Sequence, residues 1–364
     1  MFGSSIYAVI LAGGSGTRFW PKSRHLMPKQ LCEIGSETET MIEMTLGRLE
    51  SLIPPERRLI VTHIDQVEKT RDIVGERCHW YLAEPCSRNT GNAIAAAALE
   101  IKQHAAEAGT EPIMISLHAD AIIKKEEAFV SALKQSVEVA KKGHLALLGI
   151  APEYPETGYG YIEKGSMIDD NQFEFQVSSF REKPDRRTAE QYLKKGNFFW
   201  NAGIFSWKIE TILAEFERWH PEILHTLRPL LDQKKSFSQV PQHLFAEVYR
   251  QLPNVTIDQG ILERSRHVAV IPCSIGWQDV GSWDALDKCY SKNDDGNIIA
   301  ADSLLFDCEN TTVDSDGPFV GAIGLKDLVI VAAKGAILVC PKDRAQEVKK
   351  IVEKLKQDER GDLL

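Results

Sequence analysis

The sequence contains no long apolar run, and no stretch approaches the roughly 18 consecutive apolar residues that a membrane-spanning helix needs. Its first segment, Met1–Ile6, is short and carries no basic residue, so a secretory signal is not expected there. Cysteines are few: the seven are scattered and form no CxxC pair, which indicates neither a disulfide framework nor a zinc knuckle. We therefore expect a cytoplasmic protein with reduced cysteines and no membrane partner.

Basic charge is also scarce. The chain has 43 lysines and arginines against 52 acidic residues, which leaves a formal net charge of −9. Nucleic acid is therefore not expected as the main partner, because basic surface is what holds a phosphate backbone. A nucleotide is not excluded, since a small anion needs only a few well-placed cations and backbone N–H groups. The 364 residues are enough for one large domain and one or two smaller ones.

In the first half of the chain, short aliphatic strands alternate with amphipathic helices. The expected strands are Tyr7–Ala12, Arg58–His63, Ile113–Leu117 and Leu145–Ala151, and the expected helices are Met41–Leu52, Asn92–Ala108 and Glu126–Lys141. This alternation predicts βαβ units and an α/β fold. We expect a Rossmann-like, mixed but mainly parallel sheet flanked by helices, with ligands at the carboxyl ends of its strands.

The second half has a different pattern. From about Pro152, glycine- and aromatic-rich segments such as Thr157–Ile162 indicate antiparallel additions to the sheet. The polar stretch Ser291–Asn297 is typical of a linker. The short strands expected after it are Leu304–Asp307, Leu328–Ala332 and Ala336–Cys340, and the closing helix is Asp343–Gln357. We predict a large nucleotide-binding domain over residues 1–290 and a small β-rich domain that ends in a helix over residues 291–364, the latter built as a partial β-helix or as a small sheet.

A glycine-rich loop follows the first strand. In the segment Tyr7–Arg18, a buried strand leads into Gly13, Gly14 and Gly16 and then to Arg18. Glycine permits positive φ and lets backbone N–H groups approach an anion closely. The guanidinium of Arg18 suits phosphate oxygens. Such a loop on its own is also compatible with a tight turn that binds nothing.

The loop differs from two common phosphate-binding motifs. A Walker loop needs Lys followed by Ser or Thr after its last glycine, whereas Thr17 follows Gly16 here. The dinucleotide fingerprint needs a small residue where Phe19 stands. The segment Pro28–Gln30 comes soon afterwards, and its lysine, Lys29, is a candidate second phosphate ligand rather than an ordinary surface lysine.

These two segments together resemble the nucleotidyltransferases that activate sugar 1-phosphates, whose N-terminal motif runs from a GGxGTR loop to a nearby PKQ or PKP. The segment Glu84–Thr90 is similar to the EPxxRNT sequence of the mannose-1-phosphate guanylyltransferase family. Further segments that match in order and spacing are Thr157–Glu163, Phe180–Asp185, Trp200–Phe205 and Trp277–Trp283. The resemblance covers roughly residues 6–290. It implies transfer of GMP from GTP to α-D-mannose 1-phosphate, giving GDP-mannose and pyrophosphate.

Two carboxylates are candidates for a metal site. Asp120 ends a buried strand and Asp279 stands between two tryptophans. From local sequence, Asp120 is equally compatible with a helix cap, and Asp279 with a tight turn. Together they suit Mg²⁺, which prefers one or two carboxylates plus phosphate oxygens. The resemblance implies that these two positions hold the metal.

No general base is expected, because a phosphate monoester is already largely dianionic at neutral pH. Catalysis would then depend on positioning and on charge neutralisation by Mg²⁺, Arg18, Lys29 and Lys183. The resemblance implies that Arg18 and Lys29 face the phosphates of GTP and that Lys183 faces the phosphate of the sugar.

The resemblance also implies two binding sets. The nucleotide set is Leu11, Ala12, Gly13, Gly14, Ser15, Gly16, Thr17, Glu84, Pro85, Asn89 and Thr90. The sugar set is Tyr159, Gly160, Glu182 and Asn201. For Glu182 and Asn201, a turn or hairpin role is the alternative.

The sequence departs from the family pattern at two points. The family usually reads RNTAP, whereas Gly91 and Asn92 follow Thr90 here, and Asn92 is expected to bear on how the base is held. The family usually has proline where His118 stands, and we expect a packing role for this histidine. A different purine nucleotide or a different sugar 1-phosphate therefore remains an alternative, as does a non-catalytic sugar-nucleotide sensor.

In relatives, a tail such as Asn297–Leu364 packs on the catalytic domain and often forms a dimer contact, so the resemblance implies a homodimer. The tail is too short for the cupin-type isomerase domain of some longer relatives, so a single activity is expected.

Overall fold

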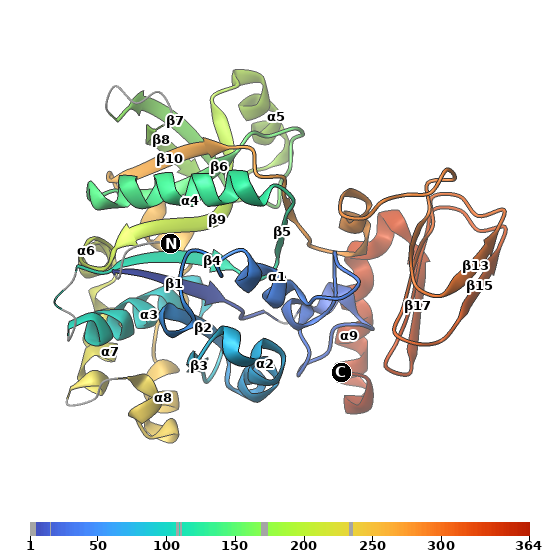
Figure 1. Ribbon diagram of the computed structural model, residues 1–364, viewed down its shortest axis with the longest axis horizontal. Helices are drawn as coiled ribbons and strands as arrows, with labels where there is room; N and C mark the ends of the chain where they lie inside the picture. Colours follow the sequence, from blue (N-terminus) through green and yellow to red (C-terminus); the bar gives the residue numbers. More distant parts are fainter. Residues whose placement is uncertain (1–4, 15, 107–108, 110, 169–173, 233–235) are drawn as a thin grey trace.

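The computed structural model describes residues 5–14, 16–106, 109, 111–168, 174–232 and 236–364. A nine-stranded sheet has the strand order β3-β2-β1-β4-β9-β6-β10-β8-β7 (Figure 1). Its strands are β1 (Ile6–Leu11), β2 (Arg58–His63), β3 (Trp80–Glu84), β4 (Ile113–His118), β6 (Leu145–Ile150), β7 (Tyr161–Met167), β8 (Phe175–Arg181), β9 (Phe198–Lys208) and β10 (Val268–Cys273). The helices near it are α1 (Met41–Gly47), α2 (Val67–Val74), α3 (Asn89–Ala106), α4 (Glu126–Lys141), α5 (Arg186–Lys195), α6 (Ile209–Trp219), α7 (Pro221–Leu231) and α8 (Gln242–Tyr249). No helix in these described ranges is both long and apolar enough to cross a membrane.

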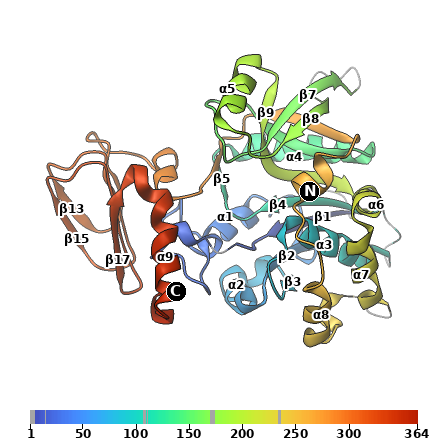
Figure 2. The same ribbon diagram turned by 180° about the vertical axis from the view of Figure 1, so that it is seen from behind.

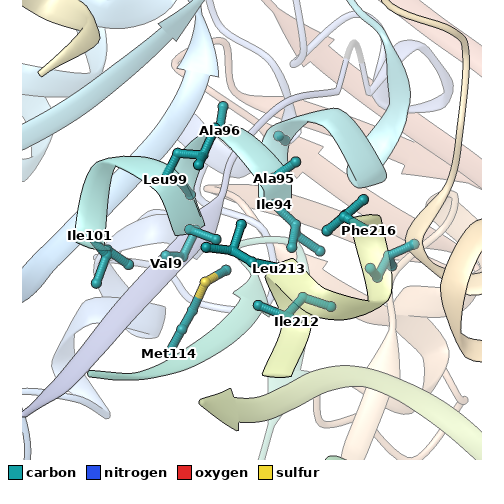
Figure 3. Packing of buried hydrophobic residues seen from close by; sticks show 14 of the residues in the cluster. Val9, Ile94, Ala95, Ala96, Leu99, Ile101, Met114, Ile212, Leu213 and Phe216 are labelled. Atoms are coloured by element: carbon teal, nitrogen blue, oxygen red, sulfur yellow. The ribbon is translucent and has the colours of Figure 1, made fainter. Parts of the chain in front are cut away.

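The central strands are buried on both faces of the sheet. Val9 of β1 belongs to one apolar cluster with Met114 and with helices α3, α6 and α7, and Figure 3 shows it near Leu213 of α6. Its neighbours Ala8 and Ile10 belong to a second cluster with α1, α2 and α4 on the opposite face. Successive side chains of a strand alternate between faces, so a strand covered on both sides is apolar throughout. The larger part of the molecule is therefore a three-layer α/β structure.

The pairing of the strands confirms the expected fold class. Strands β3, β2, β1 and β4 are mutually parallel, as are β6 and β10. The antiparallel additions expected after Pro152 are present as β7, β8 and β9. Strand β9 pairs with both β4 and β6, an insertion that the sequence analysis did not predict, and helices α5 to α8 were not predicted either. The helix expected to end at Leu52 is shorter, because α1 ends at Gly47.

The C-terminal region contains the predicted partial β-helix. Its strands are β12 (Ile298–Ala300), β13 (Ser303–Phe306), β14 (Thr312–Ser315), β15 (Val320–Ile323), β16 (Leu328–Ala333) and β17 (Ala336–Pro341). Strands β12, β14 and β16 are parallel neighbours, and β13 is parallel to β15, so successive turns of chain stack on one another. Strand β17 is antiparallel to β16. Helix α9 (Val348–Gln357) stands between these strands and the larger part of the molecule in both views (Figures 1 and 2).

A buried ion pair joins the two parts. Nζ of Lys22 lies 3.0 Å from a carboxylate oxygen of Asp314 on β14 and 3.3 Å from one of Asp316. The indole nitrogen of Trp20 donates to the carbonyl of Leu363 over 2.9 Å. Phe19 belongs to the same apolar cluster as the buried residues of α9. Lys22, which the sequence places between the glycine loop and Pro28–Gln30, therefore serves the contact with the C-terminal region.

Lys22→Met is expected to lower the free energy of unfolding by about 3 kcal/mol, because it leaves the carboxylate of Asp314 buried without its cation. The side chain of Asp314 is only 3% exposed. Urea denaturation followed by tryptophan fluorescence measures the change. The matched control is Lys326→Met, which removes an exposed lysine paired with Glu309 in the same region and should leave the midpoint unchanged. Equal midpoints for all three proteins would contradict the prediction.

Candidate active site

The carboxyl ends of β1 and β4 open into a cavity of about 840 Å³. This is the edge of a parallel sheet at which ligands are expected. The predicted site residues that line the cavity are Leu11, Ala12, Gly13, Gly14, Gly16, Thr17, Arg18, Lys29, Asp120, Tyr159, Lys183 and Asp279. Ser15 lies outside the described residues. The structure thus brings together the glycine loop, both metal candidates and all three predicted cations.

The glycine loop is held against the segment that carries Lys29. Gly16 has a φ of +54°, and a Cβ there would lie only 2.7 Å from the backbone nitrogen of Lys29. The hydroxyl of Ser23 donates to the carbonyl of Gly16 over 2.7 Å, and the side-chain amide of Gln30 donates to the carbonyl of Ala12. Position 16 therefore requires glycine for two reasons: its φ is positive, and the backbone of Lys29 leaves no room for a Cβ.

The two carboxylates are brought together by a short antiparallel pair of strands. Strand β5 (Ala121–Ile123) pairs with β11 (Trp277–Asp279), and the register places Asp279 opposite the residue after Asp120. Nζ of Lys29 lies 3.0 Å from Oδ2 of Asp120. Residues far apart in the sequence therefore form one compact charged group at the cavity wall.

The pKa values of the two carboxylates are shifted in opposite directions by their surroundings. Burial raises the pKa of Asp120, but the nearby charges of Lys29 and His118 outweigh it, so this pKa lies below its usual value. Burial also raises the pKa of Asp279, and there the charge of Asp120 adds to the effect. Lys29 donates a further hydrogen bond to the carbonyl of Val280 over 2.8 Å. The positive charge of Lys29 therefore does not fully neutralise the negative charges of the two carboxylates.

A divalent cation fits this donor set. Asp120 and Asp279 offer hard oxygen ligands, and their mutual repulsion would be relieved by a metal ion. Within the described ranges, no cluster of three or more His, Cys, Asp or Glu side chains could hold a metal on its own. The protein would thus supply two carboxylates and leave the other coordination positions to phosphate oxygens and water, as Mg²⁺ prefers.

A second, smaller cavity of about 310 Å³ lies beside the glycine loop. Its lining includes Gly13, Gly14, Glu84, Asn89 and Thr90. Pro85 lines neither of these two cavities. Apart from Ser15 and Pro85, the predicted nucleotide set is therefore divided between a large charged cavity and a smaller pocket, and Leu11, Gly13 and Gly14 line both.

Glu84 is the one acidic residue of the predicted nucleotide set, and its side chain is buried. Oε1 of Glu84 accepts a hydrogen bond from the hydroxyl of Tyr249 over 2.5 Å. Its other oxygen faces the glycine loop, since a Cβ built on Gly13 would lie 3.3 Å from Oε2. Burial raises the pKa of Glu84 to about 7, although the hydrogen bond from Tyr249 opposes this. One carboxylate oxygen thus remains available to a ligand in the pocket.

Glu84→Gln is expected to reduce the pH dependence of the free energy of unfolding. The pKa of Glu84 is about 7 in the folded chain, against about 4.3 when unfolded. The folded wild type binds this proton more tightly, so it loses stability as the pH rises from about 4 to about 7. The difference between variant and wild type should therefore shift in favour of the variant by roughly 3 kcal/mol between pH 5 and pH 8. Urea denaturation at several pH values measures it, and a difference that stays constant with pH would contradict the prediction.

The start of α3 is tied to a segment that we call the strap, residues 250–257. The backbone nitrogen of Gly91 donates to the carbonyl of Val255 over 3.0 Å, and a Cβ on Gly91 would lie 2.6 Å from that oxygen. The side-chain amide of Asn92 is buried and donates to the carbonyl of Pro253 over 2.7 Å. The same amide donates to the carbonyl of Arg88 over 2.6 Å, so Asn92 joins the strap to the segment that precedes Asn89 in the smaller cavity.

Of the predicted sugar set, Tyr159 lines the main cavity, whereas Gly160, Glu182 and Asn201 lie together next to Lys183, which also lines it. A Cβ on Gly160 would lie 2.5 Å from a carboxylate oxygen of Glu182 and 3.3 Å from Cβ of Asn201. Lys183 has a φ of +46°, and its Nζ lies 2.9 Å from Oε1 of Glu182. Tyr159 packs edge-on against Trp200 and Trp277. A positive φ at a non-glycine residue is uncommon and occurs preferentially at functional sites.

The chain matches the family described as nucleotidyl transferase over residues 7–295, and the MannoseP isomerase/GMP-like beta-helix domain over residues 301–355. A mannose-1-phosphate guanylyltransferase of Klebsiella pneumoniae is 37% identical to it over 97% of this chain and 74% of that protein. One of Escherichia coli is also 37% identical, over 97% of this chain and 74% of that protein. The chain belongs to the mannose-1-phosphate guanylyltransferase family of nucleotidyl transferases.

A solved structure supports the same relationship. The crystal structure described as mannose-1-phosphate geranyltransferase from Thermus thermophilus superposes with a TM-score of 0.86 at 33% identity. The superposition covers 97% of this chain and 99% of that one, so it extends over both parts of the molecule. A divalent metal is general in the nucleotidyl transferase family, which agrees with the fit of the two carboxylates described above.

In this guanylyltransferase-family chain, the structure adds residues that the sequence analysis missed. Gln346 and Lys349 of the C-terminal region line the main cavity, and no motif signals them. Tyr249 reaches Glu84 from the end of α8. His118, for which we expected a packing role, lines both cavities, and its ring lies 3.0 Å from the position of a Cβ on Gly203.

Proposed function

We propose that this chain transfers the GMP moiety of GTP to α-D-mannose 1-phosphate, giving GDP-mannose and pyrophosphate. The observation that carries the proposal is one cavity in which Arg18 and Lys29 stand near the two carboxylates and Lys183 stands near the sugar set. Two polyanionic substrates must approach each other in this reaction, and cations on both sides of a metal site are what such an approach requires.

In the proposed reaction, an oxygen of the sugar phosphate forms a bond to the α-phosphorus of GTP. The bond from that phosphorus to the α,β-bridging oxygen breaks, and its electron pair leaves with pyrophosphate. Arg18 and Lys29 neutralise phosphate oxygens of GTP, and Lys183 orients the nucleophile. Asp120 and Asp279 would hold Mg²⁺, which, when bound, supplies neutralisation of phosphate charge. No side chain need take a proton from the nucleophile, because it is already an anion.

The smaller cavity supports guanine as the base. The free carboxylate oxygen of Glu84 accepts hydrogen bonds, and guanine presents N–H donors at N1 and N2 where adenine has no donor. The loss of a proton from Glu84 near pH 7 favours this contact, because an ionised carboxyl is an acceptor only. Asn89 and Thr90, whose side chains are bonded to Asn254 and to the backbone nitrogen of Ile257, form the wall of the same pocket.

The experiment that tests the function measures pyrophosphate release for GTP, ATP, UTP and dTTP, each with mannose 1-phosphate and glucose 1-phosphate, in the presence of Mg²⁺. The highest kcat/KM is expected for GTP with mannose 1-phosphate. A higher value for ATP with glucose 1-phosphate would overturn the substrate assignment and leave the reaction type intact. Absence of release with every pair would favour a non-catalytic sensor, which the presence of all five predicted cations and metal carboxylates in one cavity argues against.

We also propose that the catalytic domain comprises residues 1–290 and that residues 291–364 mediate a homodimer in the cytoplasm. Large apolar side chains are exposed on two sheets of the C-terminal region: Leu304, Phe306 and Ile323 on the β13–β15 pair, and Ile337 and Val339 on β17. An apolar surface of this kind on an edge of sheet favours a protein contact. Seven free thiols fit a reducing compartment. Sedimentation equilibrium of Ile323→Asp against wild type tests the contact, and an unchanged dimer or a monomeric wild type would contradict it.

A further inference from the structure

Asp258 contacts the predicted sugar set through Asn201, although no motif in the sequence singles it out. We call the surroundings of Gly160, Glu182 and Asn201 the sugar pocket. Asp258 begins the π-helical turn Asp258–Leu262. Its Oδ1 accepts a hydrogen bond from Nδ2 of Asn201 over 2.9 Å. Single π-helical turns are rare and occur frequently at functional sites. A carboxyl group in direct contact with a predicted sugar-binding amide is therefore a candidate for a role in that site.

The contact with Asp258 determines which way the amide of Asn201 faces. The amide oxygen of Asn201 accepts from the backbone nitrogen of Gly203 over 3.0 Å, and the backbone nitrogen of Asn201 donates to the carbonyl of Gly160 over 2.8 Å. A reversed amide would place its NH₂ against the N–H of Gly203 and its oxygen against the carboxyl of Asp258. The first contact is repulsive in any case and the second whenever Asp258 is ionised, so the observed orientation is the favoured one.

Asp258 also faces a second acid. Burial raises the pKa of Asp258 to about 7, and the neighbouring charge of Glu182 contributes in the same direction, while Lys183 opposes it. Two acid groups and an amide thus converge where Gly160 leaves no space for a side chain. Adjacent hydroxyl groups of a pyranose offer O–H donors to both acids and would relieve their repulsion.

The position of Asp258 is set by the nucleotide half of the site. The preceding residue, Ile257, donates its backbone N–H to the hydroxyl of Thr90 in the base pocket over 3.0 Å. The strap that ends at Ile257 is bonded along its length to the start of α3. The backbone contacts of the strap thereby fix the position of Asp258, so its side chain is held against Asn201.

We propose that Asp258 is a specificity-determining residue of the sugar pocket, which orients the amide of Asn201 and, together with Glu182, recognises adjacent hydroxyl groups of the hexose 1-phosphate. The inference rests on the proposed function and names a further residue of the same site. Asp258 distinguishes sugars by the arrangement of their hydroxyl groups, not by their phosphate.

The test compares wild type with Asp258→Ala, Asp258→Asn and the control Gln259→Ala, which alters an exposed side chain on the same turn. For each protein, kcat and KM are measured for mannose 1-phosphate and GTP, and kcat/KM is compared between mannose 1-phosphate and its C2 epimer, glucose 1-phosphate. Asp258→Ala is expected to raise the KM for mannose 1-phosphate by about 10- to 100-fold and to lower the epimer ratio by about tenfold, with little change in the KM for GTP. Asp258→Asn retains an acceptor for Asn201, so its KM for mannose 1-phosphate should lie much closer to the wild-type value. The control should behave as wild type.

A purely structural role for Asp258 predicts equal rises in both KM values or an unchanged epimer ratio, and either result overturns the inference. If Asp258→Ala does not fold, Asp258→Ser also removes the carboxyl group and is judged by the same ratio. A wild-type protein inactive with GTP would instead contradict the proposed function. The epimer ratio is then taken from calorimetric Kd values for the two sugar phosphates, where a ratio unchanged by the truncation again overturns the inference.

Discussion

Asp279→Asn is expected to lower the rate of pyrophosphate release at saturating substrates by about 10³-fold. The variant replaces one of two carboxylates that the β5–β11 pair brings together at the cavity. A neutral amide is a much weaker ligand for a hard divalent cation than a carboxylate is. The measurement is a steady-state assay over a range of Mg²⁺ concentrations, and Asp120→Asn should give a loss of similar size.

The same variant should remain folded. Burial and the charge of Asp120 raise the pKa of Asp279, so its ionised form is disfavoured by its surroundings in the folded chain. Removing that charge should leave the melting temperature unchanged or raise it, a pattern typical of residues retained for function at a cost in stability. Circular dichroism during heating measures this, so a loss of activity by unfolding is distinguished from a loss of the metal ligand.

The control for this prediction is Asp294→Asn, which changes an exposed aspartate in the predicted linker. It should turn over as wild type does. Wild-type activity in Asp279→Asn, or an equal loss in the control, would contradict the metal assignment. Activity that is independent of added Mg²⁺ after exhaustive chelation would contradict the choice of cofactor.

Lys29→Met is expected to lower kcat/KM for GTP by about 10²-fold, the usual cost of removing one charged donor from a preorganised anion site. Nζ of Lys29 contacts Asp120 and the carbonyl of Val280, and Lys29 lines the main cavity. The methionine side chain keeps most of the volume of lysine and removes its charge. Initial rates at varied GTP concentrations measure the effect, and the KM for mannose 1-phosphate should change less.

Lys29→Met also removes a donor from the carbonyl of Val280, so a loss of stability of about 1–2 kcal/mol is expected as well. Urea denaturation separates this loss from the kinetic effect. The matched control is Lys102→Met, since Lys102 pairs with Glu210 on an exposed surface. A change in kcat/KM for GTP that is no larger than that of the control would exclude Lys29 from the phosphate site.

The sequence was sufficient to predict the parts of the site that depend on local chemistry. The glycine loop follows a buried strand, and its glycines permit the positive φ that Gly16 adopts. The aliphatic run of strand β4 ends at His118, two residues before Asp120. Parallel strands place their carboxyl ends at one edge, which brings the loop and this aspartate together. The resemblance to a family then assigned roles to residues that periodicity alone cannot rank.

The parts that the sequence did not reveal depend on contacts between distant segments. Tyr249 and Asp258 lie in segments that carry no recognised motif, yet they meet Glu84 and Asn201. Gln346 and Lys349 reach the cavity because α9 and the 3₁₀ turn before it, Lys342–Glu347, pack beside the larger part of the molecule. Strand β9 inserts between β4 and β6, and its length and aromatic content do not specify those neighbours.

By itself, the sequence determined the α/β class, the partial β-helix and the charged groups of the candidate site, because strand periodicity, glycine placement and charge are properties of short segments. Only the tertiary structure decided that Lys22 serves the contact with the C-terminal region, that Asn92 holds the strap, and that Asp258 contacts Asn201. The physical reason is that the partner of a polar side chain depends on which backbone and side-chain groups the fold brings within about 3 Å of it, and these come from segments far away in the chain.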